Sequence, residues 1–249
     1  MHPTSHLILI SGWAHTAAEL EDLRKRIKNA GKVIAVSTAD LWNGTHDKAT
    51  IPSPYAEGLK KMLNELGGRA FVAGWSLGGI IAIETALNWP ELFKGLILIS
   101  STPKFCVGKC WSTGTPAGSI RAMLKGLKQN PRAVFKTFFE TATAFSREAE
   151  DTLKARIESA DAMNPRELIY GLEYLRDADF SGSAQNLSLP TLIIHGQRDL
   201  IINIEAARRL NSLLALSSLR VYDDYGHGLP SQNPQQVADD IMSFIESIK

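Results

Sequence analysis

The chain has 249 residues, of which 44% are hydrophobic, so it can bury a large core in one domain or in two. Its formal net charge is +1, and this bulk charge favours neither nucleic-acid binding nor membrane binding. Two cysteines, Cys106 and Cys110, are too few for a disulfide framework or a four-thiolate zinc site. We therefore interpret both as reduced packing residues and expect no metal and no other cofactor.

The first residues, MHPTSHLILISGW, lack the cationic segment of a signal peptide, and their apolar run is too short for one. No uninterrupted apolar run is long enough to span a bilayer. We expect a cytoplasmic, monomeric protein with no nucleic-acid or membrane partner.

Short apolar runs alternate along the chain with longer amphipathic stretches. The runs predict strands over 6–10, 32–38, 69–74, 95–100, 191–196 and 219–224. Helical spacing of apolar residues predicts helices over 17–31 (with Gly31 as the C-terminal cap), 55–66, 78–88 and 234–248. The strand runs are apolar throughout, which is typical of a parallel sheet covered on both faces. We therefore predict an α/β fold with a mostly parallel sheet of about six strands.

Residues 103–186 interrupt this alternation, because they contain helical periods and no strand candidate. We predict a helical cap inserted before the strand at 191–196. The core would then comprise residues 1–102 and 187–249.

Ser76 lies in the stretch Gly74-Trp75-Ser76-Leu77-Gly78, which fits G-x-S-x-G. The stretch falls where a predicted strand meets a predicted helix, the setting of a nucleophile elbow. Glycines there allow close approach of strand and helix, and the Leu77 N–H at the helix start points toward the serine. Ser76 is the candidate nucleophile; relief of crowding in a glycine-rich turn is the alternative.

A serine hydroxyl needs a neighbouring base, and the base needs an acid to orient it. His227 follows the last predicted strand, and Asp199 follows the strand at 191–196, so both fall at the edge of the sheet that carries Ser76. Asp223 and Asp224 are nearer to His227 in sequence and are rivals for the acid. We interpret the other histidines as structural or exposed: His6, His15, His46 and His195.

The loop after the first strand, Ser11-Gly12-Trp13, is placed to supply a second oxyanion donor. Gly12 allows close approach, and the Trp13 N–H would then face the Leu77 N–H across a carbonyl oxygen. Trp13 and Trp75 are candidate substrate-binding residues at the mouth of the site. Core packing is an equally good interpretation of both rings.

Four stretches resemble one family: GWSLGGIIAIETA, the SGW after the first strand, ISSTPKF after the fourth strand, and GLEYLRDADFSGSAQNLSLPTLIIHGQRD. The order Ser, Asp, His is that of the α/β-hydrolases. Within that superfamily the chain is similar, from residue 6 onward, to the pimeloyl-[acyl-carrier protein] methyl ester esterases of biotin synthesis (BioH). The resemblance implies that Ser76 attacks the methyl ester at the far end of a carrier-bound pimeloyl chain, while His227 passes its proton to departing methanol.

The chain departs from this family in three places. Ser11 stands where relatives carry a histidine, and residues 39–48 replace a D-x-P-G-x-G-x-S loop that walls the pocket. The antiparallel strand pair that usually precedes HLILI is absent, which is why we expect about six parallel strands.

The predicted cap carries one sign of charge over its first part. Seven basic residues and no Asp or Glu occur there: Lys104, Lys109, Arg121, Lys125, Lys128, Arg132 and Lys136. A solvated helix face is one interpretation; docking of an acidic acyl carrier protein is the other. The resemblance implies docking through Arg132, Lys136 and Arg147, with Asp151 in place of a basic residue. Phe138 and Phe139 are candidates to line an acyl tunnel, and Phe135 is a third. Core packing is the better interpretation of at least one of these rings.

The first interpretation is therefore a serine carboxylesterase acting on a carrier-bound acyl methyl ester. A general carboxylesterase, lactonase or C–C bond hydrolase acting on small free substrates has the same fold and triad. A hydrolase-fold receptor or carrier-binding module without turnover is the third interpretation.

Overall fold

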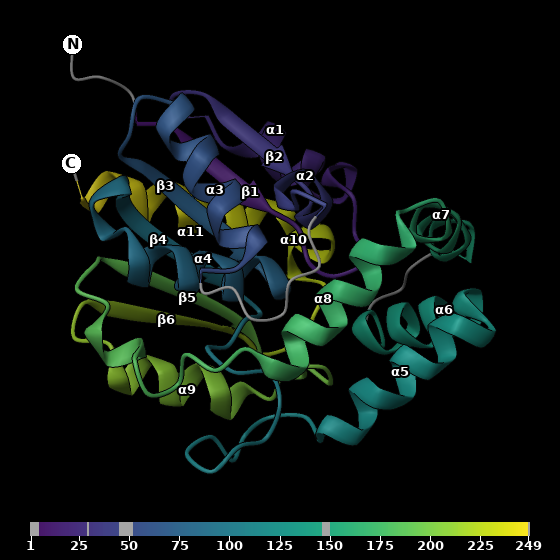
Figure 1. Ribbon diagram of the computed structural model, residues 1–249. Helices are drawn as coiled ribbons and strands as arrows, with labels where there is room; N and C mark the ends of the chain where they lie inside the picture. Colours follow the sequence, from purple (N-terminus) through teal and green to yellow (C-terminus); the bar gives the residue numbers. More distant parts are fainter. Residues whose placement is uncertain (1–4, 29, 45–51, 146–149, 249) are drawn as a thin grey trace.

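The computed structural model describes residues 5–28, 30–44, 52–145 and 150–248. Its centre is a parallel sheet of six strands in the order β2-β1-β3-β4-β5-β6 (Figure 1). The strands are β1 (Leu7–Ile10), β2 (Val33–Val36), β3 (Ala70–Trp75), β4 (Phe93–Ile99), β5 (Thr191–Gly196) and β6 (Ser217–Tyr222). All five neighbouring pairs are parallel, so the predicted sheet is confirmed.

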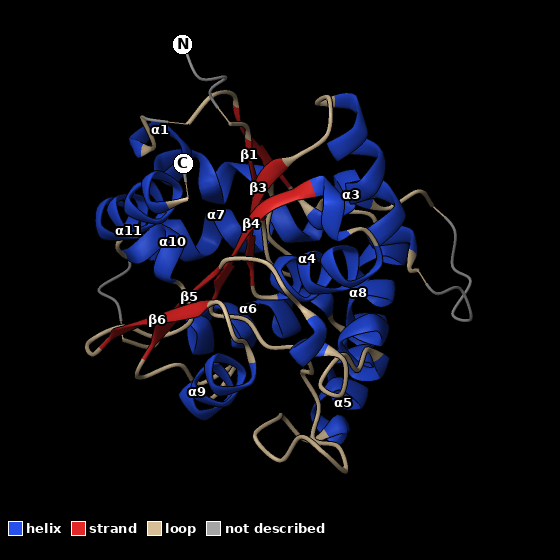
Figure 2. Cartoon of the chain, turned by 90° about the vertical axis from the view of Figure 1, so that its left-hand side faces the viewer, coloured by secondary structure: helices blue, strands red, loops and turns tan. Residues whose placement is uncertain are grey.

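Helices cover both faces of the sheet, as the edge-on view in Figure 2 shows. One face carries α1 (Glu21–Arg26), α10 (Leu229–Gln232) and α11 (Pro234–Ser247); the other carries α3 (Pro54–Glu65), α4 (Leu77–Asn88) and α9 (Ile204–Leu213). Short elements complete the core: η1 (Ala17–Leu20), α2 (Thr38–Leu41) and η2 (Pro90–Leu92). Two buried apolar clusters result, because successive strand residues face opposite sides.

The helix predicted over 17–31 is wrong in its extent. A 3-10 turn and α1 cover only Ala17 to Arg26, and Ile27 has an extended backbone. Gly31 does not cap a helix, because its N–H donates to the carbonyl of Ser5 at 2.8 Å.

The insertion between β4 and β5 is helical. It contains α5 (Ala117–Gln129), α6 (Pro131–Ala142), α7 (Glu150–Asp161), α8 (Pro165–Asp177) and η3 (Ala184–Asn186). These four helices lie together beyond one end of the strands (Figure 1). The division into a core and a cap at residues 103 and 186 stays a prediction.

Buried carboxylates tie α8 to the core. Glu84 of α4 accepts hydrogen bonds from the Tyr174 hydroxyl (2.6 Å) and from the Ser53 backbone N–H (2.8 Å). Glu167 of α8 accepts hydrogen bonds from the Tyr55 hydroxyl at 2.7 Å and from Thr38 at 2.8 Å. Burial raises the pKa of Glu167, and the hydrogen bonds from Tyr55 and Thr38 oppose that rise. The helix that faces the site is therefore held at both its ends.

Gly74 is required by the close approach of β3 and α4. A Cβ atom at this position would lie 2.4 Å from backbone atoms of Gly78 and Gly79, which cannot move aside as a flexible side chain can. We expect Gly74→Ala to lower the free energy of unfolding by about 3 kcal/mol, near the upper end for overpacking. Chemical denaturation measures this, with Gly182→Ala as the matched control, because a Cβ on Gly182 meets no atom within 4 Å. Equal stability of the two variants would contradict the close approach.

Candidate active site

Ser76 occupies a sharp turn between β3 and α4. Its backbone has φ 54° and ψ −118°, a conformation that non-glycine residues rarely adopt. Two hydrogen bonds hold the turn: the Ser76 N–H donates to the Ile99 carbonyl (2.9 Å), and the Ser101 hydroxyl donates to the Ser76 carbonyl (2.7 Å). This strained, doubly held backbone lifts the hydroxyl above the end of the sheet.

The structure brings Ser76, His227 and Asp199 into one hydrogen-bonded row. The Nε2 atom of His227 lies 2.9 Å from the Ser76 Oγ, and its Nδ1 lies 2.8 Å from the Asp199 Oδ2. His227 comes from the loop between β6 and α10, and Asp199 from the loop after β5. All three side chains are close to fully buried. The row has the connectivity that a hydroxyl, a base and an orienting acid need for proton transfer.

The Asp199 carboxylate is held in its ionised form. Burial alone would raise its pKa, but the adjacent His227 and hydrogen bonds from His195 and His227 lower that pKa well below its usual range. Its Oδ1 also accepts the backbone N–H groups of Ile201 (2.8 Å) and Ile202 (2.9 Å). The carboxylate is thus both charged and fixed in orientation.

The rival acids lie elsewhere. Asp223 and Asp224 are exposed, and Asp224 pairs with Arg198 at 3.1 Å. His195 is fully buried behind the row, with its Nε2 2.8 Å from the Ile202 carbonyl and 3.3 Å from Asp199. Among these groups, Asp199 is the acid that contacts His227.

The loop after β1 packs directly against the nucleophile. A Cβ atom on Gly12 would lie 3.1 Å from the Ser76 Cβ and 3.6 Å from its Oγ, so glycine permits this contact. The Ser11 hydroxyl donates to the His15 carbonyl at 2.7 Å and closes the loop, where the resembling family carries histidine. Leu77 is the first residue of α4, so its N–H has no acceptor within the helix. The oxyanion role of the Trp13 and Leu77 N–H groups stays a prediction.

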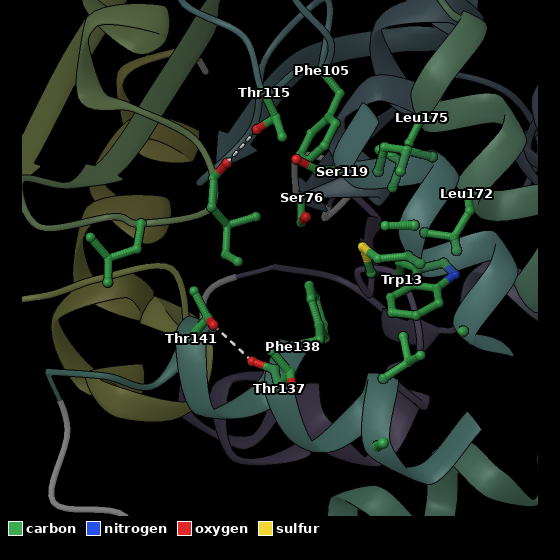
Figure 3. A pocket seen from close by; sticks show the side chains of 18 of the residues that line it. Trp13, Ser76, Phe105, Thr115, Ser119, Thr137, Phe138, Thr141, Leu172 and Leu175 are labelled. Atoms are coloured by element: carbon green, nitrogen blue, oxygen red, sulfur yellow. Dashed lines mark hydrogen bonds between the residues drawn. The ribbon is translucent and has the colours of Figure 1, made fainter. Parts of the chain in front are cut away.

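A cavity of about 490 Å³ opens above Ser76 (Figure 3). Trp13 and Phe138 line it beside Ser76, and α5 and α6 supply much of its wall. Leu172 and Leu175 of α8 form another side. Among the residues that the structure describes, its lining includes hydroxyl and amide side chains but no Asp, Glu, Lys, Arg or His. The cavity is therefore suited to a neutral, largely apolar chain.

Three predicted substrate-contacting residues do not line the cavity: Trp75, Phe139 and Phe135, the last of which is also only 1% exposed. Trp75 is only 1% exposed and belongs to the cluster on the opposite face of the sheet. Every second side chain of a strand points to the same face, so Trp75 shares that face with Phe71 and Ala73. Phe139 is also 1% exposed and packs against His15, with ring centroids 5.1 Å apart. Phe138, one residue earlier in α6, faces the cavity instead.

His15 is a neighbour of the site that sequence reasoning left without a role. It is buried between Trp75 and Phe139, and neither ring nitrogen has a partner within the described residues. Burial first, and then the charges of Arg156 and His227, lower its pKa well below the usual value, so the ring is neutral. Its position four residues after Ser11 in the site loop was the available signal.

Acidic residues distant in sequence neutralise part of the basic stretch. Lys104 pairs with Asp179 at 2.5 Å, and Arg132 pairs with Asp161 at 2.8 Å. Lys136 lies 3.8 Å from Glu140 on the same helix. No ion pair involves Arg121, Lys125 or Lys128 among the residues whose placement the structure gives: those of 5–28, 30–44, 52–145 and 150–248.

Three earlier expectations fall partly or wholly outside these ranges. Arg147 and His46 lie outside the described residues, as does the stretch 45–48 of the replaced loop. Within the described residues, no helix is long and apolar enough to cross a membrane. No group of three or more His, Cys, Asp or Glu side chains there could hold a metal ion.

The parallel sheet, the strained turn at Ser76 and the Ser–His–Asp row together define a hydrolase of the α/β class. The chain belongs to the alpha/beta hydrolase fold family, which it matches over residues 6–234. It is 29% identical to the pimeloyl-[acyl-carrier protein] methyl ester esterase of Aromatoleum aromaticum, over 93% of this chain and 94% of that protein. The protein of the same name from Aliivibrio salmonicida is 24% identical, over 97% and 92%.

Among solved structures, the chain resembles an esterase from Exiguobacterium antarcticum, with a TM-score of 0.87, 21% identity and coverage of 99% and 93%. It also resembles a meta-cleavage product hydrolase from Pseudomonas fluorescens, with a TM-score of 0.78, 18% identity and coverage of 98% and 92%. At these identities the likeness concerns the fold alone, because enzymes with the same fold catalyse different reactions.

Proposed function

We propose that this protein is a serine carboxylesterase that hydrolyses the methyl ester of a pimeloyl chain carried by an acyl carrier protein. The observation that carries the esterase part is the hydrogen-bonded row of Ser76, His227 and Asp199 at the floor of an uncharged cavity. The proposed substrate is supported by the names of the two relatives above, because those proteins are similar to this chain over more than nine-tenths of its length.

The reaction proceeds in two halves. His227 Nε2 takes the Ser76 proton as the hydroxyl attacks the ester carbonyl, and the N–H groups of Trp13 and Leu77 stabilise the resulting oxyanion. His227 then gives that proton to the leaving methoxy oxygen, so that methanol departs and an acyl group remains on Ser76. Water, deprotonated by the same imidazole, attacks this acyl-enzyme and releases the carboxylic acid and the free serine. Asp199 stays ionised and stabilises the imidazolium that forms in both halves.

The cavity fits the acyl chain of such a substrate. It follows the facing sides of α5 and α6 from Ser119 to the connection at Gln129 and Asn130. Ten residues of helix correspond to about 15 Å, which accommodates an extended chain of several methylene groups. A neutral methyl ester is compatible with an uncharged lining, whereas burying its carboxylate product there would be costly.

Cations flank the cavity without entering it. At 100° per residue, Arg121, Lys125 and Lys128 occupy the side of α5 turned away from the lining residues, and Arg132 and Lys136 do so on α6. These faces carry the proposed docking of an acidic carrier protein. The α5 cations are the stronger candidates, since Arg132 and Lys136 already pair with acids.

The test compares a carrier-linked pimeloyl methyl ester with short p-nitrophenyl esters. We expect the double variant K125E/K128E to lower kcat/KM for the carrier ester about 10-fold at low ionic strength, with a smaller loss at high salt. Hydrolysis of the p-nitrophenyl ester should not change. Lys61→Glu on α3 is the matched control, because it reverses an exposed charge on a helix outside the insertion.

Each outcome separates one interpretation. Hydrolysis of p-nitrophenyl esters without hydrolysis of the carrier ester would refute the carrier substrate and favour a general hydrolase. Equal background rates for wild type and Ser76→Ala on every ester would refute catalysis and favour a receptor or binding module. Unchanged carrier turnover in K125E/K128E and also in R132E/K136E would refute docking through these faces.

A further inference from the structure

Trp75 makes a buried hydrogen bond to the residue that acts as the base. Its indole Nε1–H donates to the backbone carbonyl of His227 at 2.9 Å, although the two residues are 152 positions apart in sequence. Trp75 is the covalent neighbour of Ser76, and its ring lies on the far side of the sheet from the cavity. The indole therefore contacts the loop that carries His227 from the face of the sheet opposite the cavity, and it has no access to substrate.

The carbonyl of His227 lies at the part of the loop where the imidazole needs fixing. On one side, the Tyr225 carbonyl accepts the Arg198 N–H at 3.0 Å; on the other, the Gly228 carbonyl accepts the Gln232 N–H at 2.9 Å. The Trp75 bond secures the position between them. Because the peptide unit carries the Cα of His227, holding its carbonyl limits where the ring can lie between Ser76 and Asp199.

The indole itself is held in place by packing. The neutral ring of His15 lies 4.2 Å from it, centroid to centroid, at an interplanar angle of 41°, and the His227 ring lies 6.1 Å away. Leu229 and Ile99 belong to the same buried cluster. A donor that cannot turn away makes its hydrogen bond without a further cost in side-chain entropy.

We propose that Trp75 is a positioning residue: its indole N–H ties the backbone of the general base to the residue adjoining the nucleophile. The separation of His227 Nε2 and Ser76 Oγ, 2.9 Å, then depends on a short connection through one side chain. This inference rests on the proposed roles of Ser76 and His227. It assigns Trp75 to the geometry of proton transfer and not to substrate binding.

Trp75→Phe removes the N–H and keeps an aromatic ring. We expect kcat for p-nitrophenyl ester hydrolysis to fall about 10- to 100-fold, as small misplacements of catalytic groups do, with KM unchanged. The rate at which a fluorophosphonate labels Ser76 should fall by the same factor, because labelling needs the activated hydroxyl but no acyl pocket.

Trp111→Phe is the matched control. Trp111 is also 1% exposed, but its indole Nε1 has no hydrogen-bond partner within the described residues, so the variant loses ring volume and no such bond. A third protein carries 3-benzothienylalanine at position 75, which preserves the two-ring shape and lacks only the N–H. We expect it to lose kcat as Trp75→Phe does, and Trp111→Phe to retain wild-type kcat.

The outcomes distinguish this inference from the proposed function. Wild-type kcat in the benzothienyl protein would overturn the positioning role while esterase activity stands. A rise in KM with unchanged kcat would overturn it as well, since that pattern reports a loss of substrate binding. Activity of the wild type no greater than that of Ser76→Ala would instead refute the proposed function.

Discussion

Ser76→Ala is expected to lower kcat for ester hydrolysis by at least about 10⁴-fold, as removal of the nucleophile does in other serine hydrolases. Without the hydroxyl no acyl-enzyme forms, and only the oxyanion donors and the cavity remain to assist water. The fold should survive, because alanine keeps the backbone N–H bond to Ile99 and the carbonyl bond from Ser101. Steady-state kinetics with p-nitrophenyl butyrate, together with a thermal melt, measure both effects.

Ser100→Ala is the control for this experiment. Ser100 is a fully buried serine at the end of β4, it also has a positive φ (46°), and its hydroxyl has no partner within the described residues. We expect this variant to retain wild-type activity and to be labelled by fluorophosphonate at the wild-type rate. Loss of activity in Ser100→Ala, or a phosphonate adduct found on Ser76→Ala, would show that the reactive hydroxyl lies elsewhere.

The sheet and the row of three side chains could be predicted from sequence because both follow local rules. Continuous apolar runs mark buried parallel strands, and the carboxyl ends of such strands share one edge. Ser76 and Asp199 follow two of these runs directly, and His227 follows a third. A motif at a strand end therefore fixes which residues meet, even when 151 positions separate them.

Side-chain direction was harder to predict. Trp75 adjoins the nucleophile in sequence, and this adjacency suggests that its ring lines the pocket. Side chains of β3 point alternately to the two faces of the sheet, however, and the Trp75 ring lies with Phe71 and Ala73 on the face opposite the cavity. The same alternation was available in the sequence and would have corrected the prediction. For Phe138 and Phe139, a step of 100° around α6 separates the cavity from the core, and sequence spacing alone did not determine the rotation of the helix.

Charge over the insertion could not be judged from a continuous window. The stretch from Lys104 to Lys136 contains no acid, yet Asp161 and Asp179 reach Arg132 and Lys104 from helices and loops further along the chain. Tertiary contacts decide which cations have an acidic partner. Within the described part of the chain they pair Arg132 but leave Lys125 and Lys128 without an ion pair, which favours the latter two for docking.

Asp199→Asn is expected to lower kcat by about 10⁴-fold with little change in fold. The amide oxygen can replace Oδ1 and accept the N–H groups of Ile201 and Ile202. The amide NH₂ then faces His227 Nδ1, which must become an acceptor. His227 Nε2 consequently carries a hydrogen and cannot take the proton of Ser76. Kinetics at neutral pH measure the loss.

Asp224→Asn is the control, because Asp224 is exposed, lies closer to His227 in sequence and pairs only weakly at the surface with Arg198. We expect it to retain activity. An equal loss in both variants would contradict the assignment of the acid, and so would wild-type activity in Asp199→Asn.

The pH dependence of stability provides a second readout on Asp199. Its folded-state pKa is lowered, so its contribution to stability is fully present above the usual Asp value of about 3.9 and is lost as pH falls through the lower folded-state value. The Asn variant lacks this contribution at every pH. The difference in unfolding free energy between wild type and Asp199→Asn should therefore shrink as pH falls below about 4. A difference that grew as pH fell below about 4 would mean that Asp199 is protonated in the folded protein. An acid without charge could not stabilise the imidazolium that proton transfer from Ser76 creates.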